Sequence, residues 1–136
     1  MTINVELQDE QAVRLDRFAN GLRKSRGEAT AQLIEEGLRH AEFPAIEFRD
    51  SSVGREACVI GSRLAVWEVL MIAEGYELEV RKTAQHLQLD HDHVSQALHY
   101  ASAFESEVRR ELDENRAVTP EKLRDSLPPG AWVEIR

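Results

Sequence analysis

The sequence predicts a mainly helical protein with a few short β elements. Apolar residues recur at three- and four-residue spacing along most of the chain, which is the period of helices that bury one face. Short stretches at residues 2–8, 46–48 and 57–60 have instead the alternation or the apolar, turn-bounded character of strands. Hydrophobic residues make up 42% of the chain but aromatic residues only 6%, so the predicted core is small and aliphatic.

Length and charge limit the classes of protein that the chain can belong to. Its 136 residues suffice for one globular domain or two very small ones. Neither an apolar run of about 18 residues nor a basic, apolar leader is present, so we expect a cytoplasmic protein that does not contact a membrane. The net charge of −8 opposes sequence-blind attraction to phosphate backbones and excludes a histone-like role.

The charge is distributed unequally and divides the chain into three predicted parts. Residues 1–44 hold six basic and eight acidic side chains, a balance of −2. Residues 45–117 hold eight and fourteen, a balance of −6, and residues 118–136 hold three of each. These three ranges are the domains we expect, each with a different partner.

The first part reads as one strand followed by two helices. Ile3, Val5 and Leu7 alternate with Thr2, Asn4 and Glu6, which predicts a strand with one apolar and one polar face. Asp9 is the expected cap of a helix that ends near Gly21. A second helix is predicted to begin at a capping box formed by Ser25 and Glu28, and to close before Pro44.

A single strand leaves the backbone groups of both its edges unpaired, so we expect a homodimer in which two copies pair antiparallel. With this arrangement residues 1–44 resemble the ribbon-helix-helix DNA-binding domains of bacterial repressors and antitoxins. The resemblance implies that the paired ribbon enters the major groove of operator DNA and that Thr2, Asn4 and Glu6 read base edges. It further implies that Ser25, Arg26 and Gly27 bind a phosphate at the amino end of the second helix, the alternative being a helix start that needs only its cap. Glu6 departs from the basic or neutral residue usual in the family, which should weaken DNA binding.

The middle part reads as a small hairpin followed by helices. The hairpin is predicted from the strands at 46–48 and 57–60, and a helix from Leu64 to Gly75 with Trp67 in the core. Helices over 79–87 and 91–115, with Asp90 as the cap of the second, form a predicted helix-turn-helix. The opening His91-Asp92-His93 is poorly suited to a phosphate-lined groove. The apolar stripe of the long helix exceeds what a small domain covers, so its far half is expected to meet a partner.

VIGSRLAVWEVLMIAEG and TAQHLQLDHDHVSQALHYA resemble the domain of unknown function catalogued as family 433, over about residues 45–102. The resemblance rests on the turn Gly61-Ser62-Arg63 and on a set of matching positions, Val66, Trp67, Gly75, Val94, Ala97, Leu98 and Tyr100. Ala57 stands where a proline is expected and Arg55 where a glycine is common. Members are commonly VapB-type antitoxins encoded beside a PIN-like nuclease toxin, and an acidic segment suits the basic RNA-binding surface of such a nuclease.

The last part has a predicted helix start at Thr119-Pro120-Glu121 and a final apolar stretch, AWVEI. This stretch is too small to form a core, so it either docks back on the chain or adds a strand to a partner. The residues expected to bind the toxin are Phe104, Val108, Leu112, Leu123, Leu127, Trp132, Val133 and Ile135.

No constellation typical of catalysis is found, and no enzyme activity, cofactor or metal is expected. His86, His91, His93 and His99 lie close in sequence, but His91 and His93 are two apart and point to different faces of a helix. Cys58 lies in an apolar stretch and is expected to be a buried residue that packs in the core rather than a nucleophile. The predicted function is that of an antitoxin that neutralises a PIN-like nuclease and represses its own operon. The alternative is a stand-alone ribbon-helix-helix regulator whose second domain senses a ligand or oligomerises.

Overall fold

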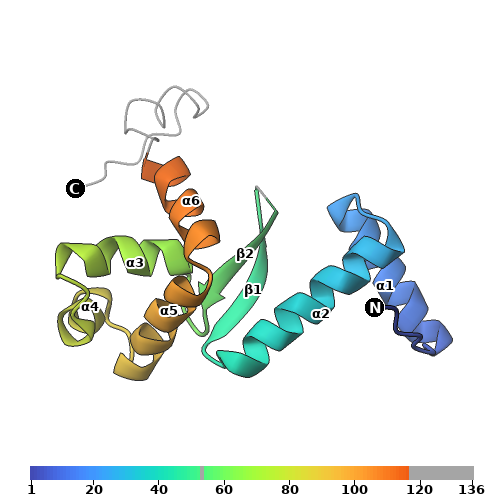
Figure 1. The fold of residues 1–136 in the computed structure, drawn as a ribbon, viewed down its shortest axis with the longest axis horizontal. Coiled ribbons are helices and arrows are strands. Elements are labelled where there is room, and N and C mark those ends of the chain that lie inside the picture. The colour runs from blue at the N-terminus through green and yellow to red at the C-terminus, as the bar shows by residue number, and fades with distance from the viewer. Residues whose placement is uncertain (53, 117–136) are drawn as a thin grey trace, which may run out of the picture. The chain divides into compact units, whose positions relative to one another are not determined.

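A computed structural model of the chain describes residues 1–52 and 54–116 (Figure 1). Within them lie six helices and one two-stranded sheet, so the predicted mainly helical class with short β elements is confirmed. In chain order the elements are α1 (Asp9–Leu22), α2 (Arg26–Glu42), β1 (Ile46–Ser51), β2 (Gly54–Val59), α3 (Val66–Gly75), α4 (Val80–Leu87), α5 (His91–Ala103) and α6 (Glu105–Arg116). None of the helices in the described ranges has the length and apolar character needed to cross a membrane.

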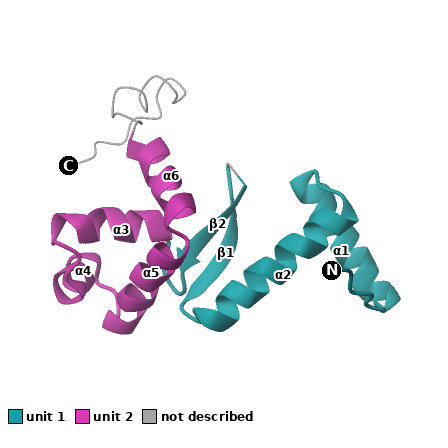
Figure 2. Cartoon of the chain, viewed as in Figure 1, with its two compact units in different colours: residues 1–63 teal, residues 64–136 magenta. Residues whose placement is uncertain are grey.

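The chain divides into two compact units, residues 1–63 and residues 64–136 (Figure 2). Unit 1 contains α1, α2 and the hairpin, and unit 2 contains α3 to α6. The hairpin, which we expected to open the middle domain, is therefore grouped with the two N-terminal helices. It is joined to them by contacts between α2 and β1.

Residues 1–8 form no strand in this single chain, and all eight are exposed. The predicted strand over residues 2–8 is thus wrong for the isolated chain. The physical reason is that a strand needs a partner to satisfy its backbone groups, and the described part of one chain supplies none for this segment. The sheet of the structure is the hairpin instead.

The first two helices begin and end close to where the sequence predicts, with one exception. Gln8, rather than Asp9, is the N-cap of α1, and the Gln8 backbone N–H donates to Oε1 of Gln11 at 3.0 Å. At the start of α2 the predicted capping box is confirmed: the Glu28 N–H donates to Oγ of Ser25 and the Ser25 N–H donates to Oε1 of Glu28, each at 3.1 Å.

The hairpin pairs β1 and β2 antiparallel, with Ile46 opposite Val59 and Ser51 opposite Gly54. Ile46, Ala57, Cys58 and Val59 are buried, as an apolar hairpin predicts. The carbonyl of Ile46 accepts a hydrogen bond of 2.6 Å from Nδ1 of His40, which holds the end of α2 against the start of β1.

In unit 2, α3 packs on α4, α5 and α6. The capping of α5 by Asp90 is confirmed, because its carboxylate accepts from the Asp92 N–H at 3.0 Å. Trp67 is only half-buried, and the large buried side chains are aliphatic residues and Tyr100.

The predicted single helix from 91 to 115 is wrong, because the chain leaves helical geometry at Phe104, where φ is −119° and ψ is 45°. The break redirects the chain so that both α5 and α6 contact α3. Val108 and Leu112 are consequently buried, with 1% and 0% of their surface exposed. Their expected role in lining a partner surface is incorrect for this conformation, since they fill the core of unit 2.

Candidate nucleic-acid interface

The N-terminal part of unit 1 exposes an unusual number of large apolar side chains. On the N-terminal segment, Ile3 is 67% and Val5 is 71% exposed, and on α2, Ile34 is 54% and Leu38 is 64% exposed. Leu7, Val13 and Leu33 add to the same set. Scattered exposed apolar residues are ordinary on a protein surface, but a set of this size within about forty residues is a candidate interaction surface.

The helices α1 and α2 bury very little in return. Their buried residues are Ala19 in α1 and Ala29 and Glu36 in α2. By contrast, unit 2 buries Val66, Val69, Val94, Tyr100, Val108 and Leu112. The two fully buried alanines contribute little apolar area to the helix pair, and Leu15, Phe18 and Leu22 of α1 are only half-buried. The helix pair therefore leaves large apolar side chains in contact with water.

The three expected base readers, Thr2, Asn4 and Glu6, lie on the exposed segment that precedes α1. Exposure leaves their side chains accessible to a ligand. In the single chain this segment is not a strand, so their alternation with Ile3, Val5 and Leu7 becomes a two-faced surface only when the segment pairs with another strand.

The amino end of α2 has a fixed start and an open approach. The side chain of Ser25 accepts a hydrogen bond from the Glu28 N–H, and the side chain of Glu28 accepts one from the Ser25 N–H. Hydrogen bonding with Ser25 lowers the pKa of the Glu28 carboxyl. A Cβ placed on Gly27 would meet no atom within 4 Å. No described part of the chain fills the space above Gly27, which is therefore open to an incoming group.

Arg26 does not point freely into solvent. Its Nε donates to Oδ1 of Asp16 at 2.8 Å, and its Nη2 donates to Oδ2 of Asp16 at 2.7 Å. This two-pronged pair raises the pKa of Arg26 and lowers the pKa of Asp16, in both cases chiefly through the hydrogen bonds. Asp16 was missed by sequence reasoning, because ten positions separate the two residues and only the turn between α1 and α2 brings them together.

Two more cations flank the amino end of α2. Arg23 has the left-handed conformation that ends α1, with φ of 55°, and Lys24 donates a hydrogen bond to Oε1 of Gln32. With Arg26, the turn that enters α2 carries three positive side chains in four residues. Of these three cations only Arg26 was predicted to bind a phosphate, although the basic run RKSR at residues 23–26 is visible in the sequence.

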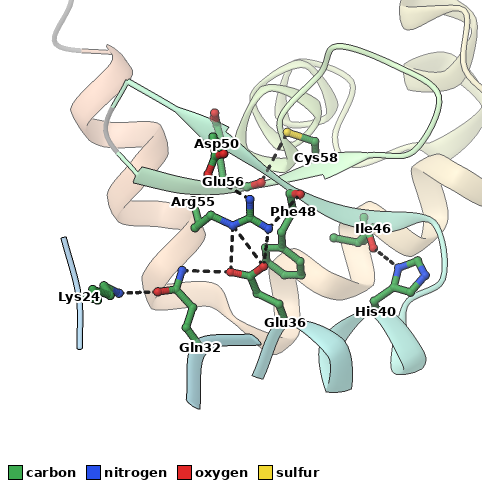
Figure 3. Close-up of polar contacts among 10 residues, drawn as sticks. All are labelled: Lys24, Gln32, Glu36, His40, Ile46, Phe48, Asp50, Arg55, Glu56 and Cys58. Atoms are coloured by element: carbon green, nitrogen blue, oxygen red, sulfur yellow. Dashed lines mark hydrogen bonds and ion pairs between the residues drawn. The ribbon is translucent and has the colours of Figure 1, made fainter. Parts of the chain in front are cut away.

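An ion-pair network holds the hairpin to α2 (Figure 3). Nη2 of Arg55, on β2, donates to Oε1 of Glu36 at 2.7 Å, and Nε of Arg55 lies 3.2 Å from Oε2 of Glu36. Gln32 donates to Oε2 of Glu36 at 3.0 Å, and Nη1 of Arg55 donates to Asp50 at 3.1 Å. The Arg55 guanidinium also lies 5.3 Å from the centre of the Phe18 ring on α1. The pKa of Arg55 is raised, mainly by its hydrogen bonds with Glu36.

The network therefore ties α1, α2 and the hairpin into one body. It was not anticipated from sequence, where Arg55 was noted only as standing where the resembled family commonly has a glycine. Nineteen positions separate it from Glu36, and no local pattern joins residues at such a distance.

Comparisons with protein-family models, with curated proteins and with solved structures found no match for this chain.

The remaining candidate residues are placed as follows. Phe104 is half-buried at the break between α5 and α6, with its ring centre 4.8 Å from that of Tyr100. The other predicted toxin contacts, Leu123, Leu127, Trp132, Val133 and Ile135, lie outside the described residues. Cys58 is buried in β2. Among residues 1–52 and 54–116, no three histidine, cysteine or acidic side chains gather as metal ligands would.

Proposed function

We propose that this chain is a dimeric DNA-binding antitoxin that represses its own operon and neutralises a PIN-like nuclease. The observation that carries the DNA-binding half is the exposed apolar set of the N-terminal segment and α2, beside a helix pair whose fully buried residues are Ala19, Ala29 and Glu36. A second copy supplies what both features lack. Two N-terminal segments pair as an antiparallel ribbon, and the apolar faces of Ile3, Val5 and Leu7 cover the helices of both chains.

In this proposed dimer the opposite face of the ribbon carries Thr2, Asn4 and Glu6. The amide of Asn4 can donate and accept in the plane of a base edge, which makes it the strongest candidate for sequence readout. The amino end of α2, with the open space above Gly27 and the three cations of its entering turn, is suited to a backbone phosphate.

Toxin neutralisation is supported by charge. Residues 64–116 contain eleven acidic and five basic side chains, a balance of −6, which favours association with the basic surface of a nuclease. Because Val108 and Leu112 are buried, the apolar part of the proposed contact is left to Phe104 and to the tail residues Leu123, Leu127, Trp132, Val133 and Ile135.

The same burial favours a second candidate function. Without an apolar stripe on α6, the described part of unit 2 offers a partner mainly charge. A stand-alone regulator, in which the second unit senses a ligand or oligomerises, needs no such stripe. Co-expression of the full chain with the product of the adjacent gene separates the two functions, since only the antitoxin co-purifies with it. In that complex Trp132→Ala should weaken binding, and a complex unaffected by it would place the contact on the acidic helices.

The dimer is tested by two substitutions on opposite faces of the same segment. Val5→Asp places a charge on the face proposed to be covered, whereas Asn4→Asp places one on the face proposed to point outward. Light scattering should show monomers or unfolded chains for Val5→Asp and dimers for Asn4→Asp. If both variants form dimers, the ribbon is not the principal dimer contact.

DNA binding is tested by two substitutions that should fail in different ways. Asn4→Ala should lose about 1 to 3 kcal/mol of discrimination between operator and random DNA. Arg26→Ala should weaken binding to both and reduce the dependence on salt, because it removes a phosphate contact. Unchanged operator binding by the Asn4→Ala, Arg26→Ala double variant would refute the assignment of both residues.

A further inference from the structure

The ion pair between Asp16 and Arg26 lies on the surface that the proposed function assigns to a phosphate. Asp16 belongs to the face of α1 next to the α2 start, and its carboxylate presents two oxygens to the guanidinium, as a phosphate would. The side chains remain 46% and 63% exposed, so the pair is open to solvent and to a competing anion.

We propose that Asp16 acts as a built-in competitor for DNA, occupying the guanidinium that would otherwise bind a backbone phosphate. The proposal rests on the proposed DNA-binding function and adds the residue that sets its strength. When DNA arrives, Arg26 must exchange one two-pronged anionic partner for another, so the loss of the ion pair offsets part of the free energy of the phosphate contact. Binding by the wild-type chain then depends more on base contacts and less on indiscriminate attraction to the backbone.

Three features make this role specific to Asp16. Arg26 donates to both carboxylate oxygens of Asp16, so this one carboxylate accounts for the ion pair at the start of α2. An aspartate is already charged at neutral pH, and the lowered pKa of this carboxyl keeps the competitor charged at more acidic pH as well. The pair is also exposed, and exposed pairs are weak enough to exchange rather than to lock the site permanently.

The test uses the full chain and a DNA duplex that spans the region upstream of its own gene, with a scrambled duplex beside it. Asp16→Asn removes the competitor, and Asp16→Glu keeps the charge and serves as the conservative variant. Glu10→Gln, an exposed position on the same helix, controls for the loss of one negative charge. Removing the competing ion pair should tighten DNA binding about threefold per site, and so about tenfold for a dimer with two sites.

We expect Asp16→Asn to tighten binding to both duplexes by this factor, well beyond Glu10→Gln, and Asp16→Glu to bind like the wild type. In an Arg26→Ala background, Asp16→Asn should gain no more than Glu10→Gln does, because no guanidinium is left to release. Circular dichroism confirms that each variant is folded. A gain for Asp16→Asn equal to that of Glu10→Gln, or one that survives Arg26→Ala, would overturn the competitor while leaving DNA binding intact. Failure of the wild type and all variants to bind either duplex would overturn both proposals.

Discussion

The ion pair between Glu36 and Arg55 is the contact in unit 1 whose removal should be felt most. Glu36→Ala deletes the 2.7 Å and 3.2 Å contacts to Arg55 and leaves the amide of Gln32 without its carboxylate partner. Breaking a fully buried ion pair costs about 3 to 5 kcal/mol. Here the Arg55 side chain is 17% exposed and keeps Asp50 and the Phe48 carbonyl as partners. These remaining contacts reduce the expected loss to about 2 to 3 kcal/mol.

Asp50 provides a matched control, because it pairs with the same guanidinium from the surface. Its side chain is 79% exposed, and the contact with Arg55 is 3.1 Å. An exposed pair contributes about 0 to 1 kcal/mol, so Asp50→Ala should have little effect. The comparison keeps Arg55 constant and sets a buried partner that makes several contacts against an exposed partner that makes one.

Urea unfolding followed by circular dichroism measures the difference. Trp67 lies on α3 of unit 2, so in a Trp132→Phe background tryptophan fluorescence follows unit 2 while circular dichroism follows the helices of both units. Glu36→Ala should lower the circular dichroism midpoint more than the fluorescence midpoint. If Glu36→Ala and Asp50→Ala destabilise the chain equally, burial does not decide the strength of these pairs and the reasoning fails.

Three further outcomes are expected. Leu112→Ala should cost about 2 to 5 kcal/mol of stability in a fluorescence-detected unfolding experiment, because it opens a cavity, whereas Leu78→Ala on the surface should stay within about 0.5 kcal/mol. Ser25→Ala should cost about 1 kcal/mol in thermal unfolding by removing the cap of α2. The pKa values of Asp16 and Glu28 are lowered in the folded chain, so their contribution is present above their ordinary values of about 4 and is lost as the pH falls through the lowered values. Acid titration of helicity should therefore show a loss below about pH 4 that is shallower in Glu28→Gln.

Local chemistry made much of the fold predictable. The capping box of Ser25 and Glu28, the cap at Asp90 and the hairpin around 46–59 each depend on residues within a few positions of one another. Their hydrogen bonds are satisfied inside one turn or one hairpin. Such features can be predicted because the residues that form them are close together in the sequence.

The features that escaped prediction depend on distant parts of the chain. The break at Phe104 interrupts an apolar period that continues without a gap, and it lets α5 and α6 both pack on α3, a contact with a distant part of the chain. The pairs Asp16–Arg26 and Glu36–Arg55 join residues ten and nineteen positions apart. The N-terminal strand fails in the single chain for the opposite reason, since the partner it needs is not within the described chain at all.

That last failure bears on how the proposed dimer would work. The helix pair fully buries only Ala19, Ala29 and Glu36, so in the proposed dimer the covering of Ile3, Val5, Ile34 and Leu38 by a second copy would add to the stability of the pair. Association and ordering of the N-terminal segment are then one event. The proposed base readers alternate along the same segment with the residues that would be covered, so they acquire a defined orientation only when the dimer forms. In the proposed antitoxin, DNA recognition would therefore rise with the concentration of the chain itself, which is the dependence that repression of its own operon requires.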